Sequence, residues 1–280
     1  MPWVILLLSL LGAHDSAAVR VRFLDVGQGD ATLIVSPEGK RVLVDGGRSA
    51  TDVAQMLRAA GVDTLDLVVA SHADADHIGG LAAVFHTTHV RAYLDNGRPH
   101  TTATYRRLMQ TVERSNTQYL QATARTITLG SVILRVLPPP ADAEGQNNAS
   151  VGLLLEYGNF RSLLVGDAEQ DELRHFVQLG VPRVSVLKAA HHGARNGVSP
   201  AWVHATQPRV VVISVGAHNP YGHPSPVALR YYGRYADAVY RTDQQGAILV
   251  TGRRDGSFSV TYRAPDGARA TRHFPAREAP

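Results

Sequence analysis

Four side chains that bind divalent metals lie within six consecutive positions, directly after the apolar run 65–70. They are His72, Asp74, Asp76 and His77. The apolar run predicts a buried strand, and a strand that ends in a loop and a helical turn presents such side chains from a rigid base. Because the chain has no cysteine, a cation here would be bound through imidazole and carboxylate groups. The alternative is a polar loop in which Asp74 or Asp76 caps a helix, although capping does not require a histidine at each end of the cluster.

The composition fits a folded domain and permits a polyanionic partner. The chain has 280 residues, 44% of them hydrophobic, which suffices for one large domain or two small ones. Only 19% are charged, which argues against wholesale disorder. The net charge of +4 and the pI of about 9.5 are compatible with binding a polyanion. A genome rich in G and C would equally explain why nearly all of the positive charge is arginine.

The N-terminus predicts export. Residues 3–13 are almost wholly apolar, and Ser16 and Ala18 follow as small residues before a cleavage point. The run is shorter than the ~20 residues that a spanning helix needs. We therefore expect a signal peptide over residues 1–18 and a periplasmic or extracellular protein; the alternative is an uncleaved N-terminal anchor or a piece of a longer membrane protein. No other segment has the pattern of a membrane span, so no multi-span membrane domain is expected.

The order of the apolar runs predicts an α/β chain with two sheets. A cluster of strands comes first, strand–helix alternation follows, and the same order is then repeated. This pattern favours two sheets packed face to face with helices outside, in one domain over residues 19–263. The residues 264–280 are rich in Arg, Ala and Pro, and they are expected to form a flexible, solvated tail.

Further polar side chains follow other apolar runs. Asp45, Asp167 and the pair His191 and His192 each come just after a predicted strand. A metal site needs ligands from several strand ends to converge, so Asp167 and His191 become candidate ligands beside the first cluster. Taken alone, Asp167 is also explained as a helix N-cap, and His191 as a packed or surface histidine.

Together these motifs carry a resemblance. They extend over nearly the whole chain and are Leu24–Ala31, Leu43–Gly47, Ser71–Gly80, Leu164–Glu169, Lys188–Gly193 and Asn219–Pro224. Their order and spacing resemble the metallo-β-lactamase fold and, more narrowly, the hydrolase domain of the ComEC family of DNA-uptake competence proteins. The resemblance implies an αββα sandwich of two mixed sheets with outer helices and a metal site at one sheet edge.

The resemblance also implies a set of metal ligands, with a departure. His72 and Asp74 would face a first metal, Asp76, His77 and His191 a second, Asp167 would bridge the two, and Asp45 would orient a ligating histidine. A histidine expected on a loop before Asp167 is missing, and the loop offers Asn147, Asn148 and Ser150 as weak ligands instead. We therefore expect one or two divalent ions, Zn²⁺ or Mn²⁺, because harder ligands shift the preference away from zinc.

The expected chemistry is attack by a metal-bound hydroxide on a phosphodiester. Asp76 would orient the nucleophile, His223 would donate a proton to the leaving oxygen, and Lys188 and His192 would neutralise a phosphate oxygen. The candidate substrate-binding residues are Gln28, Asp30 and Tyr221. Ordinary loop packing is the alternative for each of these roles.

The preferred function is therefore a metal-dependent phosphodiesterase or nuclease acting on single-stranded DNA at the cell envelope. Without a multi-span segment, the chain would be a stand-alone relative of ComEC or a soluble partner of an envelope channel. Two alternatives stay open: a hydrolase of small phosphodiesters, lactams or lactones, and a non-catalytic nucleic-acid-binding module with a degenerate metal site.

Overall fold

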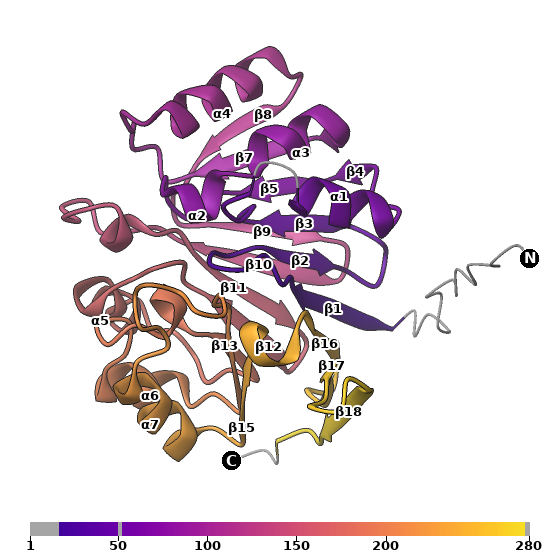
Figure 1. Cartoon of the computed structure of the whole chain (residues 1–280), viewed down its shortest axis with the longest axis vertical. Coiled ribbons are helices and arrows are strands. Elements are labelled where there is room, and N and C mark those ends of the chain that lie inside the picture. The colour runs from indigo at the N-terminus through magenta and orange to yellow at the C-terminus, as the bar shows by residue number, and fades with distance from the viewer. Residues whose placement is uncertain (1–16, 50–51, 278–280) are drawn as a thin grey trace, which may run out of the picture.

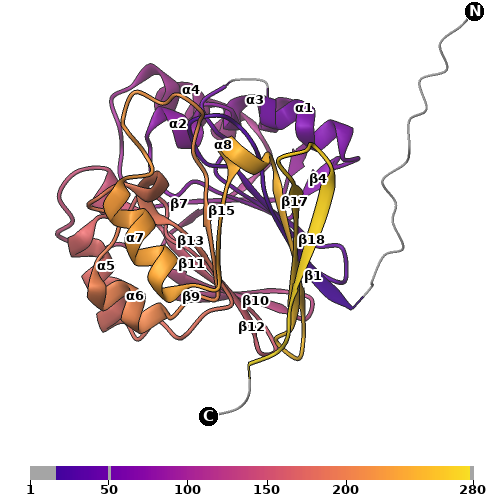
Figure 2. The same ribbon diagram turned by 60° about the horizontal axis from the view of Figure 1, so that its bottom comes forward.

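Two β-sheets pack face to face between outer helices in the computed structural model, which describes residues 17–49 and 52–277 (Figures 1 and 2). The expected αββα sandwich of two mixed sheets is confirmed. The predicted signal peptide falls almost wholly on residues 1–16, which lie outside the described residues. Within the described ranges, none of the helices is both long enough and apolar enough to cross a membrane.

The first sheet has nine strands. Its pairing is antiparallel from β18 to β3 and parallel from β3 to β8. In spatial order the strands are β18 (Arg269–Phe274), β17 (Phe258–Arg263), β16 (Ile248–Arg253), β1 (Ala18–Phe23), β2 (Thr32–Val35), β3 (Arg41–Val44), β5 (Leu67–Val69), β7 (Ala92–Asp95) and β8 (Gln118–Gln121).

The second sheet has seven strands. It is parallel from β15 to β12 and antiparallel from β12 to β9. Its order is β15 (Ala238–Arg241), β14 (Val210–Ile213), β13 (Val186–Lys188), β12 (Phe160–Leu164), β11 (Gly152–Tyr157), β10 (Val132–Leu137) and β9 (Arg125–Leu129), and a separate parallel pair is formed by β4 (Thr64–Leu65) and β6 (His89–Val90).

Side-chain caps mark the beginnings of α4, α6 and α7. The side chains of Thr102, Ser199 and Ser225 accept hydrogen bonds from backbone N–H groups in the first turns of α4, α6 and α7. The helices are α1 (Asp52–Ala59), α2 (Ala75–Ile78), α3 (Leu81–Thr87), α4 (Ala103–Arg114), α5 (Gln170–Gln178), α6 (Pro200–Thr206), α7 (Pro226–Tyr235) and α8 (Thr242–Gln245), with short 3₁₀ turns η1 (Asn147–Ala149) and η2 (Ala190–Gly193).

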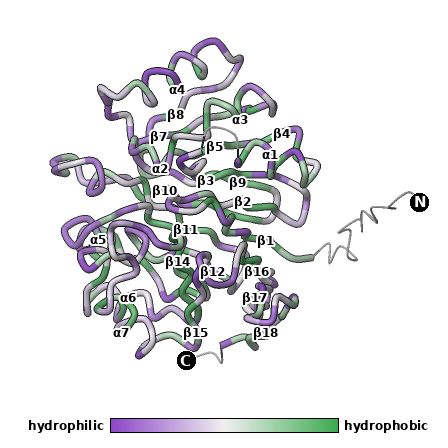
Figure 3. The backbone as a smooth tube through the Cα atoms, viewed as in Figure 1, coloured by the Kyte–Doolittle hydropathy of each residue, from purple (hydrophilic) through white to green (hydrophobic). Residues whose placement is uncertain are grey.

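An apolar cluster fills each boundary between layers. The central one lies between the two sheets and joins residues such as Val21 of β1 and Leu153 of β11. A second lies between the nine-stranded sheet and α1, α3 and α4, and a third between the seven-stranded sheet and α5, α6 and α7. In Figure 3 hydrophobic residues follow many of the strands, and hydrophilic ones line much of α4. Burial on both faces explains why many strands read as continuous apolar runs.

The prediction of a solvated tail from residue 264 is wrong for Arg269–Phe274, which forms β18 against β17. Phe274 is buried and its ring stacks on that of Phe258, with ring centroids 4.6 Å apart, and the Arg209 guanidinium lies over both rings. The strand was missed because its inward positions hold an alanine, an arginine and a single aromatic residue, which is a weak alternating pattern.

Candidate metal centre

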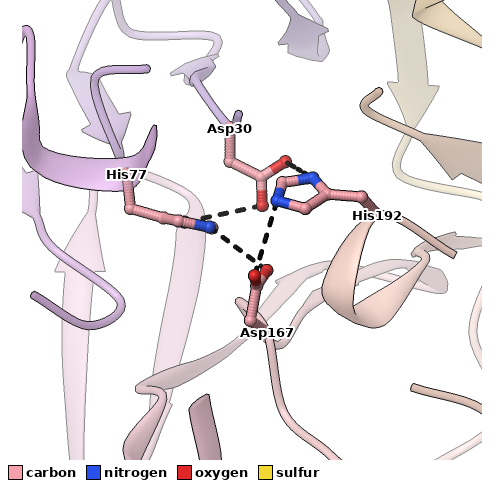
Figure 4. A group of neighbouring side chains, drawn as sticks. All are labelled: Asp30, His77, Asp167 and His192. Atoms are coloured by element: carbon pink, nitrogen blue, oxygen red, sulfur yellow. Dashed lines mark ion pairs between the residues drawn. The ribbon is translucent and has the colours of Figure 1, made fainter. Parts of the chain in front are cut away.

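Loops from both sheets meet at one end of the sandwich. Asp30 precedes β2, the segment His72–His77 follows β5, Asp167 follows β12 and His192 follows β13. Because β2 and β5 belong to one sheet and β12 and β13 to the other, the site forms only when the two sheets pack. Figure 4 shows Asp30, His77, Asp167 and His192 pointing toward one another.

These four residues form a buried cluster of candidate ligand atoms. One atom from each lies within 4.8 Å of one from every other. Nε2 of His77 is 3.2 Å from Oδ1 of Asp167, and Nε2 of His192 is 3.4 Å from Oδ2 of the same carboxylate. The expected meeting of Asp167 with the His72–His77 segment is therefore seen in the geometry, and Asp167 lies at its centre.

Asp45 and Ser71 fix the ring of His77. Nδ1 of His77 donates to Oδ2 of Asp45 at 2.9 Å, and the same carboxylate accepts from the backbone N–H and the hydroxyl of Ser71. This arrangement leaves Nε2 facing Asp167, as an outer carboxylate does for a ligating histidine. Although burial lowers the pKa of His77, the carboxylates of Asp167 and Asp45 outweigh it and raise that pKa well above its usual value.

The loop that carries Asp30 closes directly onto the metal-binding segment. The backbone N–H of Asp30 donates to the carbonyl of Asp76 at 3.1 Å, and Gly46 donates to the carbonyl of His77. Gly29 has φ +137°, and a Cβ there would lie 2.3 Å from the Asp76 carbonyl oxygen. Only glycine fits this approach, which accounts for Gly29 in the motif Leu24–Ala31.

His191 and His192 lie at different depths in the site. His192 is buried, and its Nδ1 donates to the Ser214 carbonyl at 2.9 Å, which aims Nε2 at the carboxylates. His191 is partly exposed, and its Nε2 is 3.9 Å from Asp167. Both have left-handed backbone conformations, with φ of 49° and 52°. His192, which we expected to contact substrate, thus lies closer to Asp167 than His191, which we expected to bind metal.

The other residues of the first motif surround the cluster. Oδ2 of Asp76 is 3.4 Å from Nε2 of His192, and Oδ2 of Asp74 is 3.6 Å from Nε2 of His72. His72 is buried, while Asp74 remains partly exposed. Asp76 and His77 are therefore directed toward Asp167 and His192, whereas Asp74 pairs with His72 and lines the pocket described below.

Lys188 is buried beneath the cluster and pairs with Asp30. Its ammonium contacts Oδ2 of Asp30, donates to the Gly166 carbonyl at 3.0 Å and lies 3.9 Å from Oδ1 of Asp167. Burial lowers the pKa of Lys188, but the charges of Asp30 and Asp167 raise it overall. Asp30 and Lys188 are 3% and 2% exposed, and neither lines the pocket described below.

The residues present fit a divalent cation. Within the described part of the chain, Nε2 of His72, His77 and His192 and Oδ1 of Asp167 are buried and have no hydrogen-bond partner. Buried polar atoms are normally paired, and a cation would satisfy these atoms together. Imidazole and carboxylate are the donor set that binds zinc and neighbouring metals.

The loop that lacks the expected histidine contains Asn147, Asn148 and Ser150, and these residues hydrogen-bond mainly to Glu169 and to the backbone of Asp167. Nδ2 of Asn147 donates to Glu169 at 3.0 Å, and Oδ1 of Asn148 accepts from the backbone N–H of Glu169. Ser150 Oγ accepts from the backbone N–H of Asp167 at 3.0 Å. Of the three predicted weak ligands, only Asn147 lines the pocket.

An open pocket of about 130 Å³ lies over the cluster. Its wall is formed by Gln28, Asp74, Asp76, Asn147, Asp167, His191, His192, Tyr221 and His223. Gln28 also holds the 216–224 loop, because its Oε1 accepts from the Gly216 backbone N–H at 3.1 Å. Burial and the neighbouring His191 and His192 lower the pKa of His223.

The sequence analysis missed Glu172, a buried acid behind the site. Its Oε2 accepts from the backbone N–H of Ser150 at 3.2 Å, while Oε1 has no hydrogen-bond partner among the described residues. Glu172 lies one turn before Phe176 on the buried face of α5. That position within an apolar stripe was the available signal.

The buried Glu172 should make the free energy of unfolding depend on pH. Burial raises its pKa to about 9, from 4.5 when unfolded, against the hydrogen bond from Ser150 and the charge of Arg98. The folded state therefore binds the extra proton, and stability should decline as the pH rises from about 4.5 to about 9. The Glu172→Gln variant keeps the acceptor and has no proton to lose. We expect it to melt several degrees above the wild type at pH ~8 and close to it at pH ~5; equal melting curves at both values would contradict the buried-acid assignment.

Comparisons with known proteins agree with this geometry. The model of the Metallo-beta-lactamase superfamily matches residues 24–218. The chain is 28% identical over 269 residues to ComE operon protein 3 of Bacillus subtilis (strain 168), covering 88% of this chain and 34% of that protein. It is 28% identical over 238 residues to Recombination protein 2 of Haemophilus influenzae, covering 82% and 28%. The chain thus spans about a third of the length of these curated relatives, which are ComEC-like competence proteins, and the resemblance read from the sequence is confirmed.

Two solved structures show the same fold. The metallo-beta-lactamase fold protein YhfI from Bacillus subtilis has a TM-score of 0.53 at 14% identity, covering 80% of this chain and 95% of that one. Igni18, a metallo hydrolase from Ignicoccus hospitalis, has a TM-score of 0.53 at 17% identity, covering 82% and 98%. At these identities the likeness concerns the fold.

Proposed function

From the premise that this chain belongs to the metallo-beta-lactamase superfamily, we propose that it is a metal-dependent phosphodiesterase that cleaves single-stranded DNA at the cell envelope. The observation that carries the proposal is the buried cluster of imidazole and carboxylate atoms that lack hydrogen-bond partners among the described residues and lie beneath a polar pocket. Relatives that are competence proteins favour DNA as the substrate, and the expected leader over residues 1–18 favours export.

We assign the metal to the cluster around Asp167. His77, Asp167 and His192 would hold one divalent ion, with Asp76 within reach, and His72 with Asp74 would hold a second, weaker one. When bound, such ions supply Lewis acidity toward phosphoryl oxygens and lower the pKa of a water. The many oxygen donors and the missing histidine favour Mn²⁺ over Zn²⁺ at the weaker position.

The chain's own residues position the substrate. His223 lies in the pocket wall with a lowered pKa, so at neutral pH it is a neutral imidazole. It would donate an N–H hydrogen bond to the leaving oxygen, in place of the proton transfer that we expected from it. His191 lies beside it, with ring centroids 5.5 Å apart, and would contact a phosphate oxygen. Lys188 neutralises Asp30 and keeps the floor of the site ordered, in place of the phosphate contact that we expected from it.

Tyr221 gives the pocket a surface for a nucleobase. It is 54% exposed, its ring stacks on that of His223, with centroids 5.9 Å apart and planes 23° from parallel, and Arg48 donates to its hydroxyl at 3.3 Å. Exposed aromatic rings beside a cationic side chain are the usual platform for unpaired bases. Such a platform favours single-stranded nucleic acid over a lactam or a simple diester.

The test is cleavage of labelled oligo(dT) by the full chain with added Mn²⁺. Tyr221→Ala is expected to raise KM about tenfold with little change in kcat, because stacking on an aromatic ring contributes ~1–3 kcal/mol per base. Tyr221→Phe keeps the ring and should behave like the wild type. With an abasic oligonucleotide, Tyr221→Ala and the wild type should have the same KM, because no base is present to stack on the ring. A wild-type chain that binds Mn²⁺ and leaves oligo(dT) intact would overturn the nuclease proposal.

A further inference from the structure

We infer that the outer face of the ribbon β1–β16–β17–β18 is a binding surface for the phosphate backbone of single-stranded DNA, and that it leads strands toward the pocket. The 24 residues of these four strands include six arginines, one histidine and no Asp or Glu. The inference deepens the proposed nuclease function and rests on it for the choice of polyanion.

The pairing register places five of these arginines on one face. Val19, Val21 and Phe23 of β1 face the central core, so the residues between them face outward. Residues that are directly opposite each other in the sheet share a face, so the pairing register also identifies the outward positions of β16, β17 and β18. Thr261 and Thr271 occupy two of these outward positions, and their hydroxyl groups are hydrogen-bonded. The five arginines are Arg20, Arg22, Arg253, Arg263 and Arg269.

This face lies beyond the helical layer. The apolar cluster beneath α1, α3 and α4 takes its strand residues from β2 to β7 and none from β16, β17 or β18. Figure 2 shows β17 and β18 at the margin of the molecule. Arg22, Arg263 and Arg269 are exposed, and none of them lies within ion-pair distance of a carboxylate of the described residues.

The arrangement is unfavourable without an anion. Arg263 and Arg269 are directly opposite each other in the antiparallel register, a placement in which like charges destabilise a sheet. Partial burial and the charges of Arg269 and Arg20 lower the pKa of Arg22. A polyanion laid across the face would relieve this repulsion and release its counterions.

The face also points to the site. β17 runs parallel to β1, since each is antiparallel to β16. The C-terminal ends of β1 and β17 therefore lie at the same end of the sheet, and Arg263 is at the end of β17. The loop that contains Gln28 begins at the end of β1. Because Gln28 lines the pocket, a DNA strand bound by Arg22 and Arg263 would be directed toward the mouth of the pocket.

The test measures binding of fluorescein-labelled oligo(dT) to the full chain, with EDTA present to stop cleavage. Arg263→Gln/Arg269→Gln should bind about tenfold more weakly near 0.1 M salt, with a salt slope shallower by ~1.4, since each single-strand phosphate contact contributes ~0.7. The control Arg107→Gln/Arg114→Gln removes the same charge from exposed positions of α4 and should bind like the wild type. Arg263→Lys/Arg269→Lys, which keeps the charge, should restore most of the affinity.

Cleavage of bis-p-nitrophenyl phosphate with Mn²⁺ should be equal in all these variants, because the arginines do not line the pocket. An Arg263/Arg269 variant that binds oligo(dT) with wild-type affinity and salt slope would overturn the inference. So would a variant that loses binding only to phosphatidylglycerol vesicles, since the face would then serve a membrane. A chain that binds oligo(dT) through this face and never cleaves it would leave the inference standing and refute the nuclease proposal.

Discussion

The Asp167→Asn variant is expected to lower oligo(dT) cleavage by roughly a thousandfold or more, the scale on which loss of a group at the reacting centre acts. Asp167 is the carboxylate that both His77 and His192 approach. Although burial alone would raise it, the charges of His192 and His77 hold the pKa of Asp167 well below its usual range. Asp167 is therefore a permanent anion at the centre of the cluster, and an amide in its place removes the charge that attracts the cation. Equilibrium dialysis with Mn²⁺ should show the loss of affinity beside the loss of turnover.

The matched control is Asp171→Asn. Asp171 lies four residues further on, is exposed, and forms a surface ion pair with Arg174 at 3.0 Å, so cleavage and Mn²⁺ affinity should stay near the wild-type values. Asp167→Asn with unchanged turnover would remove the cluster from the mechanism. Loss of turnover with full Mn²⁺ affinity would instead place the cation elsewhere.

Most residues of the candidate site could be picked out from the sequence because they follow an apolar run; Asp30, which precedes β2, does not. A strand that is buried on both faces is mostly apolar until it ends, so Asp45, His72, Asp167 and His192 stood out against their neighbours. Sheet packing then brings these ends together. The same logic predicted the layered fold, since strand clusters with intervening helices have few ways to cover both faces.

The depth of each side chain could not be predicted in this way. His191 and His192 are adjacent, and two successive left-handed residues decide which of them faces the carboxylates; no residue-type preference encodes that choice for histidine. The pairing of Asp30 with Lys188 joins positions 158 residues apart (188 minus 30), and it depends on the packing of one sheet on the other. Long-range pairs of this kind leave no local pattern.

Lys188→Met is expected to cost about 3–5 kcal/mol of folding stability, which corresponds to a melting temperature lower by ~10 °C. The reason is that Asp30 would keep a buried carboxylate without its cation, and the penalty for a lone buried charge exceeds the net worth of the pair. Calorimetry on the metal-free protein at neutral pH measures this cost without a contribution from metal binding.

The chain supplies its own control, because Lys40 is its only other lysine. Lys40 pairs with Asp66 at 3.2 Å, but its side chain is 43% exposed, so Lys40→Met should change stability by less than ~1 kcal/mol. The double variant Asp30→Asn/Lys188→Met removes both charges and should recover most of the loss, since no lone ion remains. If Lys188→Met were as stable as Lys40→Met, neighbouring imidazoles at 3.6 Å and 3.7 Å from Asp30 would have to carry the compensating charge. The Lys188→Met variant should then become less stable than Lys40→Met as the pH is raised, because the imidazoles lose the protons that compensate the charge of Asp30.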